Sequence, residues 1–246
     1  MSTSTLPAPI ARTVQAEAYP TAVEISSPAA DPVTTPIPRQ ETTPTGAPAF
    51  EICSPLGMHA LVELPQIVSD PYKPPPPNKP EERHHGVDFS YWHYEMRDTM
   101  LGEPVQSVLA GVVASVIADL YPYGNMVMIE TRREDLPVGI VSRLHIAPDE
   151  SLYLLYAHLN LPPTVRLGDS VDACQPLGEV GMSGNTDIPH LHLETRLGPA
   201  GTVFESIRFY DTRATIEEMD NYVLWRTSGV FRHFDPMALL SYPINP

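Results

Sequence analysis

Basic residues are scarce in this sequence. It has 15 Lys and Arg against 30 Asp and Glu, which gives a formal net charge of −15 at pH 7. Proteins that bind the phosphates of nucleic acids do so with clustered cationic side chains. The composition therefore predicts that nucleic acid is not a partner, and it also disfavours tight adhesion to anionic polymers or lipid surfaces.

Cysteines and long apolar runs are also few. Cys53 and Cys174 have no CxxC spacing and are too few for a metal site built from cysteines, so they form either one disulfide in an exported protein or two buried thiols. The most apolar segment, residues 107–121, is too short for a membrane span and rich in β-branched residues, which predicts a core strand. The Met1 end lacks a basic start followed by an apolar run, so no signal peptide is predicted.

Residues 1–50 differ in composition from the rest of the chain. They consist mostly of Pro, Thr, Ala and Ser, and their only aromatic residues are Tyr19 and Phe50. Such a segment buries too little apolar surface to offset the entropy lost on ordering. We therefore predict a disordered linker over residues 1–50 and one domain over residues 51–246, because the 42% apolar content of the chain is sufficient for a core.

Strand signals dominate beyond the linker. Short apolar and β-branched runs alternate with turn signals such as Pro122 with Gly124. Helical periodicity is weak until residues 216–225 and 236–240. The pattern predicts a mainly β domain with short helices.

Two histidine-bearing segments are candidates for a metal site. In GNTDIPHLHLE, residues 184–194, His190 and His192 alternate with leucines, which predicts a strand with both imidazoles on one face. Taken alone, this pattern more often marks the solvated face of a strand. In ERHHGVDFS, residues 82–90, a straight strand would separate His84 from Asp88 by about 13 Å, so we expect a bend at Gly86. Two imidazoles and one carboxylate suit Zn²⁺ and leave a fourth position for water or substrate.

The order of three motifs resembles a known family. HHGVD at 84–88, YAHL at 156–159 and PHLHLE at 189–194 follow one another as in the M23 family of zinc metallopeptidases, the LytM or lysostaphin-type endopeptidases that cut peptidoglycan peptides. The similarity covers residues 83–194. It implies an antiparallel β-sheet core, one Zn²⁺ ion, and hydrolysis of peptide bonds in peptidoglycan cross-links.

The resemblance also assigns site residues. His84, Asp88 and His192 match the metal ligands of the family, while His158 and His190 match its two catalytic histidines. The pair in HLH thus combines a catalytic residue with a ligand on one strand face. Glu194 is interpreted as an exposed residue at the end of that strand. The structural or surface histidines are expected to be His59, His93, His145 and His233.

Several segments depart from the family pattern. Residues 186–188 read Thr-Asp-Ile where a Ser-Thr-Gly run is usual, which alters the loop beside the expected site. Cys174 replaces a common glycine, which favours a bond to Cys53. Residues 90–101 and 131–151 are longer than expected, and they either wall a binding groove or form solvated insertions.

Three classes of function remain open. The leading hypothesis is a zinc endopeptidase acting on peptidoglycan. The second is a non-catalytic protein of M23 fold that binds wall peptides or activates another cell-wall hydrolase, which the presence of all five site residues disfavours. The third is a non-haem iron enzyme, because two histidines and a carboxylate also describe its metal triad. Since peptidoglycan lies outside the cell membrane, we expect a secreted or cell-surface location.

Overall fold

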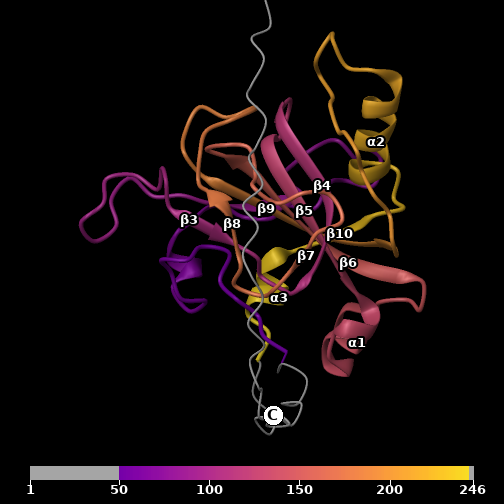
Figure 1. The fold of residues 1–246 in the computed structure, drawn as a ribbon, viewed down its shortest axis with the longest axis horizontal. Coiled ribbons are helices and arrows are strands. Elements are labelled where there is room, and N and C mark those ends of the chain that lie inside the picture. Colours follow the sequence, from indigo (N-terminus) through magenta and orange to yellow (C-terminus); the bar gives the residue numbers. More distant parts are fainter. Residues whose placement is uncertain (1–49, 244–246) are drawn as a thin grey trace, which may run out of the picture. The chain divides into compact units, whose positions relative to one another are not determined.

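The structure, a computed structural model, describes residues 50–243 (Figure 1). The linker predicted for residues 1–50 therefore lies, apart from Phe50, outside the described residues. The strands are β1 (Val68–Asp70), β2 (Gly86–Phe89), β3 (Pro104–Gln106), β4 (Gly111–Leu120), β5 (Gly124–Arg132), β6 (Glu150–Leu159), β7 (Ser170–Val171), β8 (Pro176–Glu179), β9 (Leu191–Pro199) and β10 (Arg232–Phe234). The α-helices are α1 (Val138–Leu144), α2 (Ile216–Arg226) and α3 (Pro236–Leu240), and the 3-10 helices are η1 (Leu64–Gln66) and η2 (Arg133–Asp135).

An eight-stranded antiparallel sheet organises the described domain. The strand order is β1-β2-β9-β6-β5-β4-β7, and β10 continues along the edge of β9 beyond the end of β2. β3 and β8 form a separate two-stranded antiparallel sheet. The prediction of a mainly β, antiparallel fold with short helices is confirmed.

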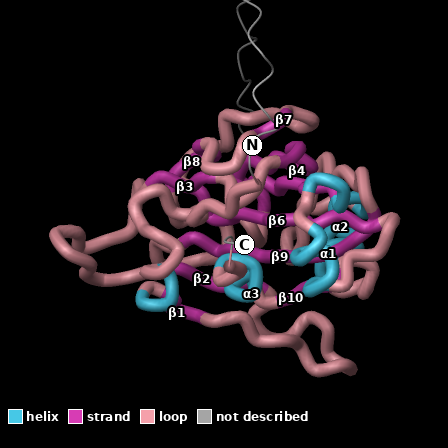
Figure 2. The backbone as a smooth tube through the Cα atoms, turned by 90° about the horizontal axis from the view of Figure 1, so that it is seen from below, coloured by secondary structure: helices cyan, strands magenta, loops and turns pink. Residues whose placement is uncertain are grey.

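The central strands are covered on both faces. Along β6, Leu154 and Tyr156 belong to one apolar cluster, whereas Tyr153 and Leu155 belong to the other, because successive side chains of a strand point to opposite faces. α1 and α3 contribute to the first cluster and α2 contributes to the second, so the helices lie on opposite sides of the strands (Figures 1 and 2). The apolar segment predicted to be a core strand forms β4.

Local signals explain where the helices begin. Thr215 and Glu218 form a capping box at the start of α2, within the segment whose periodicity predicts a helix. Asp235 accepts a hydrogen bond from the backbone N–H of Met237 at the start of α3. α1 lies in the long 131–151 connection and has no counterpart among the predicted helices. None of the helices described here is both long enough and apolar enough to cross a membrane.

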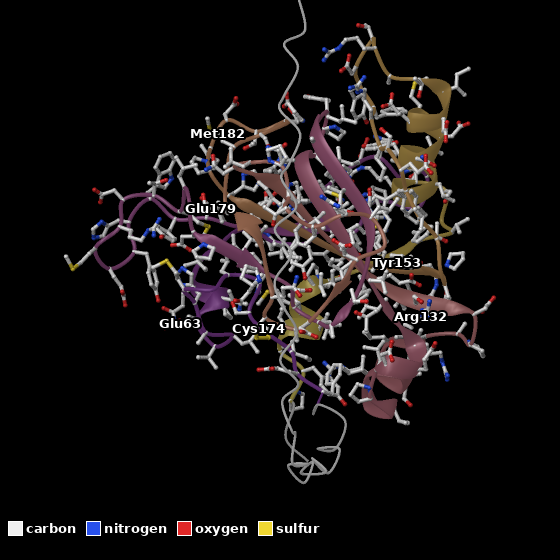
Figure 3. The ribbon with its side chains drawn as sticks, viewed as in Figure 1. Glu63, Arg132, Tyr153, Cys174, Glu179 and Met182 are labelled. Atoms are coloured by element: carbon white, nitrogen blue, oxygen red, sulfur yellow. A yellow bond between two sulfur atoms is a disulfide. The ribbon has the colours of Figure 1, made fainter. Side chains whose placement is uncertain are left out.

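Cys53 and Cys174 form a disulfide rather than two separate buried thiols. The backbone N–H groups of the two cysteines donate to the carbonyls of Val108 and Ser107 respectively, which aligns both segments beside the same stretch of chain. Cys174, labelled in Figure 3, lies just before β8. The bond therefore ties the first described residues to the β3–β8 part of the domain across a sequence separation of 121 residues.

The disulfide should contribute to stability chiefly by restricting the unfolded chain. We expect reduction, or the double substitution Cys53→Ser with Cys174→Ser, to lower the free energy of unfolding by about 2–5 kcal/mol. Urea unfolding followed by circular dichroism measures this change. Equal unfolding midpoints for the oxidised and reduced protein, or two free thiols in the denatured but unreduced protein, would contradict the expectation.

Candidate active site

Pairing of β2 with β9 brings together two of the predicted metal ligands. Asp88 lies opposite His192 in the antiparallel register. His192 Nδ1 is 2.8 Å from Asp88 Oδ1. Leu191 and Leu193, which flank His192, pack into the core on the other face of β9. The alternation of leucine and histidine therefore sets which face carries the site.

His84 reaches the same point from the segment before β2. The chain turns at Arg83, whose φ is 70°, and the backbone N–H of Lys73 donates to the His84 carbonyl. His84 Nε2 lies 3.0 Å from His192 Nδ1 and 3.1 Å from Asp88 Oδ1. The structure thus brings His84, Asp88 and His192 together, with their potential ligand atoms all within 4.8 Å of one another.

Gly86 serves close packing rather than the bend expected from the sequence. It is the first residue of β2 and is not among the residues of positive φ in the described chain. A Cβ atom on Gly86 would lie 2.4 Å from the Leu193 carbonyl oxygen and 2.9 Å from His192 Cε1. The left-handed residue that precedes His84 is Arg83, and the glycine allows β2 to approach β9.

The geometry of the three residues fits a bound metal ion. Their ligand atoms form a triangle with edges of 2.8, 3.0 and 3.1 Å. Ligands about 2.0–2.1 Å from a tetrahedral Zn²⁺ lie roughly 3.4 Å apart, so a small outward shift accommodates the ion. His84 Nδ1 lies 3.2 Å from the Pro71 carbonyl oxygen, which can only accept, so Nε2 of this ring presents its lone pair to the site.

Glu194 is fully buried beneath the site, which corrects its interpretation as an exposed strand-end residue. Its Oε1 accepts hydrogen bonds from His192 Nε2 at 3.1 Å and from the Tyr123 hydroxyl at 2.9 Å. Its Oε2 accepts from Arg196 Nη2 at 2.7 Å and from Trp225 Nε1 at 3.1 Å. With Nε2 of His192 donating to Glu194, Nδ1 is the nitrogen that would present a lone pair to a metal ion once its own proton is released.

These carboxylates make the site favourable for positive charge. Burial tends to raise the pKa of Glu194, but the charge of Arg196 and the hydrogen bond from His192 hold it well below its usual value. Burial likewise tends to raise the pKa of Asp88, and hydrogen bonds with His192 and His84 lower it instead. Burial tends to lower the pKa of His192, whereas Asp88 and Glu194 raise it to about 9. Two ionised carboxylates thus stabilise a cation beside His192.

His158 and His190 flank the three potential ligands. His158 lies near the end of β6 with a φ of 62°, and its Nδ1 donates to the Ser183 carbonyl at 2.7 Å. His190 Nδ1 donates to the Ile188 carbonyl at 3.0 Å and lies 3.1 Å from the Thr186 hydroxyl oxygen. The centroids of the two imidazole rings are 4.6 Å apart. In both rings Nδ1 carries the proton, which leaves Nε2 with a lone pair.

Both flanking imidazoles are held in the neutral form. Burial lowers the pKa of His158 to about 3, and burial also lowers the pKa of His190. His190 Nε2 lies 3.6 Å from Asp88 Oδ1, beside the potential metal ligands. A neutral imidazole in this position can orient a water molecule or accept its proton.

All five predicted site residues line one cleft with a volume of about 640 Å³. The altered loop at 186–188 also lines it, as the sequence led us to expect. The long connections 90–101 and 131–151 do not contribute to this cleft. Three lining residues that the sequence did not reveal follow β9 in the chain: Tyr210, Tyr222 and Arg226.

The remaining histidines lie outside this cleft. His85, beside the first potential ligand, is buried and accepts a hydrogen bond from Arg196 at 3.1 Å. His59 is also buried, with its Nε2 3.1 Å from Glu103. The other three are exposed or partly exposed: His93, His145 and His233.

A sheet that presents clustered imidazoles and a carboxylate in an open cleft defines a candidate metallohydrolase. Residues 82–202, just under half of the chain, match the model of peptidase family M23. The match confirms the resemblance to this family that the three motifs indicated. No curated protein matches the chain in sequence.

Several solved structures are similar to this chain. The catalytic domain of the antimicrobial peptidase lysostaphin from Staphylococcus simulans is 20% identical, with a TM-score of 0.43, over 75% of this chain and 99% of that chain. The catalytic domain of the prophage-encoded M23 protein EnpA from Enterococcus faecalis is 24% identical, with a TM-score of 0.38, over 56% of this chain and 87% of that one. A zinc-containing peptidase from Vibrio cholerae is 24% identical, with a TM-score of 0.36, over 53% and 33% respectively.

Replacing Gly86 by alanine should destabilise the domain. The new methyl group would meet the Leu193 carbonyl oxygen, which cannot easily move because β9 is paired with β2. We expect Gly86→Ala to lower the free energy of unfolding by about 1–3 kcal/mol in urea titrations. Gly178→Ala is the matched control, because its Cβ would meet only the flexible end of Leu159 at 3.3 Å. Equal midpoints for the two variants would refute the steric argument.

Replacing Glu194 by glutamine should weaken metal binding while preserving shape. Loss of the charge behind His192 is expected to reduce affinity for Zn²⁺ about tenfold to a hundredfold. Titration against a competing chelator measures the affinity, and circular dichroism checks that the variant is folded. Glu179→Gln, on the exposed end of β8, is the control. An affinity equal to that of the wild type would show that Glu194 has no influence on the metal.

Proposed function

We propose that this protein is a zinc-dependent endopeptidase that hydrolyses peptide bonds in peptidoglycan cross-links. The observation that carries the proposal is the convergence of His84, Asp88 and His192 in a cleft also lined by His158 and His190. The match of residues 82–202 to the model of peptidase family M23 supports a peptidase. The open cleft supports an extended peptide as substrate.

The ion would be held by His84 Nε2, Asp88 Oδ1 and His192 Nδ1. When bound, zinc supplies Lewis acidity toward a water molecule and a peptide carbonyl. The protein contributes the orientation of these ligands, since the Pro71 carbonyl and Glu194 accept the N–H of the two imidazoles.

His158 and His190 would move protons in this reaction. Their Nδ1–H groups donate to the carbonyls of Ser183 and Ile188, so each Nε2 is available to accept a proton from the attacking water. The imidazolium formed in this way can return the proton to the leaving amine. The same N–H can donate a hydrogen bond to the oxyanion of the tetrahedral intermediate. These proton transfers require that both imidazoles start in the neutral form, which burial favours by lowering their pKa values.

The cellular location proposed is outside the cytoplasmic membrane. Peptidoglycan lies there, and the disulfide between Cys53 and Cys174 supports an oxidising compartment. Fractionation of cells that make the native protein tests this location. Recovery of the active, zinc-loaded protein in the cytoplasm alone would overturn it.

Cleavage of defined muropeptide dimers tests the function. We expect zinc-loaded protein to create one new amino terminus at one type of cross-link, detected by mass spectrometry. His190→Ala should lower the rate by about a hundredfold or more, because general acid–base catalysis typically contributes that much. A chelator should abolish cleavage.

His93→Ala is the matched control, because this exposed histidine pairs with Asp98 away from the cleft. Its rate should equal that of the wild type. Failure of zinc-loaded wild-type protein to cut any cross-link would support instead a non-catalytic protein that binds wall peptides or activates another hydrolase.

A further inference from the structure

One arginine stands out among the residues that line the cleft. Arg226, at the end of α2, is the only Lys or Arg among the described lining residues. It lies outside residues 82–202, the segment that matches the family model.

The guanidinium of Arg226 is buried but poorly paired. The side chain is 15% exposed, and its Nε has no hydrogen-bond partner among the described residues. Nη1 lies 3.6 Å from Glu194 Oε1, and Nε lies 3.6 Å from Glu81 Oε2, both too long for a good hydrogen bond. Nη2 donates to the Arg83 carbonyl at a distance of 3.4 Å. A buried cation normally has its N–H donors satisfied, whereas the donors of Arg226 are only weakly engaged and its side chain lines the cleft.

Two tyrosines add further donors at the same end of the cleft. The hydroxyl of Tyr210 donates to Glu81 Oε2 at 3.1 Å, and that of Tyr222 lies 3.4 Å from the same oxygen. Burial raises the pKa of both phenols, so both remain protonated donors at neutral pH. The carboxylate of Glu81 thus lies beside the two phenols and 3.6 Å from Arg226, which marks a position that a carboxylate can occupy.

We propose that Arg226, Tyr210 and Tyr222 form a subsite for a free carboxylate of the peptide substrate. This proposal rests on the proposed function. Glu194 Oε1 lies between Arg226 Nη1, at 3.6 Å, and His192 Nε2, at 3.1 Å. Arg226 and the potential metal ligand His192 thus both approach Glu194, which places the subsite beside the candidate metal centre.

The charges around the cleft favour one orientation of such a peptide. Asp70, beside His84 at 3.5 Å, and Asp187 are also lining residues and repel a carboxylate. Arg226 offers a planar fork of N–H donors that matches a carboxylate in shape. A stem peptide with a free carboxylate is thus directed toward the α2 end of the cleft.

A matched pair of substrates tests the subsite without altering the protein. The pair consists of cross-linked muropeptide dimers that are identical except that the stem-peptide carboxylates are free in one and amidated in the other. We expect the free form to be cut with a KM about tenfold to a hundredfold lower, because charge-assisted hydrogen bonds are lost on amidation. Equal KM values would overturn the subsite while leaving the endopeptidase function intact.

Substitutions in the protein test whether Arg226 is responsible for the preference for the free carboxylate. Arg226→Gln should remove the difference between the two substrates by raising the KM of the free form, with kcat little changed. Arg232→Gln is the control, because this exposed arginine pairs with Glu150 away from the cleft, and it should keep the full preference. Retention of the preference by Arg226→Gln would overturn the assignment.

A binding measurement separates the two proposals. Calorimetric titration of zinc-loaded His190→Ala protein with both dimers reports affinity whether or not the protein is a peptidase. Tighter binding of the free form, together with no cleavage by the wild type, would support the subsite and refute the endopeptidase function. Equal binding of both forms, or binding of neither, would overturn the subsite.

Discussion

A buried negative charge that has to be neutralised organises this domain. The carboxylate of Glu194 is removed from solvent, which would be unfavourable without close partners. Its donors are His192 and Arg196 on the same strand, Tyr123 just before β5, and Trp225 on α2. For the carboxylate to accept these hydrogen bonds, α2 has to pack on the sheet and His192 has to turn its Nε2 inward. The orientation of a potential metal ligand is thus a consequence of the electrostatics of the core.

The sheet supplies the second constraint. Because side chains alternate along a strand, the residues that pack in the core lie on one face and the residues of the candidate site lie on the other. On β9 the leucines pack into the core on one face, while His192 and Glu194 lie on the other. The register with β2 then places Asp88 opposite His192. Two of the three potential ligands therefore stand on paired strands, which hold side chains more precisely than free loops. Only His84 depends on the turn that precedes β2.

The sequence predicted the elements and residues whose signals are local. Alternating leucines and histidines indicated the strand and its polar face, and the periodicity near residue 220 indicated α2. The same alternation extends to Glu194, but glutamate is usually exposed, and the partners that make its burial possible are distant in sequence. The prediction of a bend at Gly86 was wrong for a similar reason. The Leu193 carbonyl that leaves no room for a side chain at this position belongs to another strand. Tyr210 and Arg226 reach the cleft only through the packing of α2, which no local pattern encodes.

The last turn of α2 gives adjacent residues two different tasks. Trp225 points inward and donates to Glu194, whereas Arg226 lines the cleft. A shift of this turn would move both side chains together. Substitutions that move this turn as a whole would therefore alter both the lining of the cleft and the hydrogen bond to Glu194, whereas a change confined to the Arg226 side chain leaves Trp225 in place. A new substrate preference that is reached by shifting α2 would thus require compensating changes around Glu194.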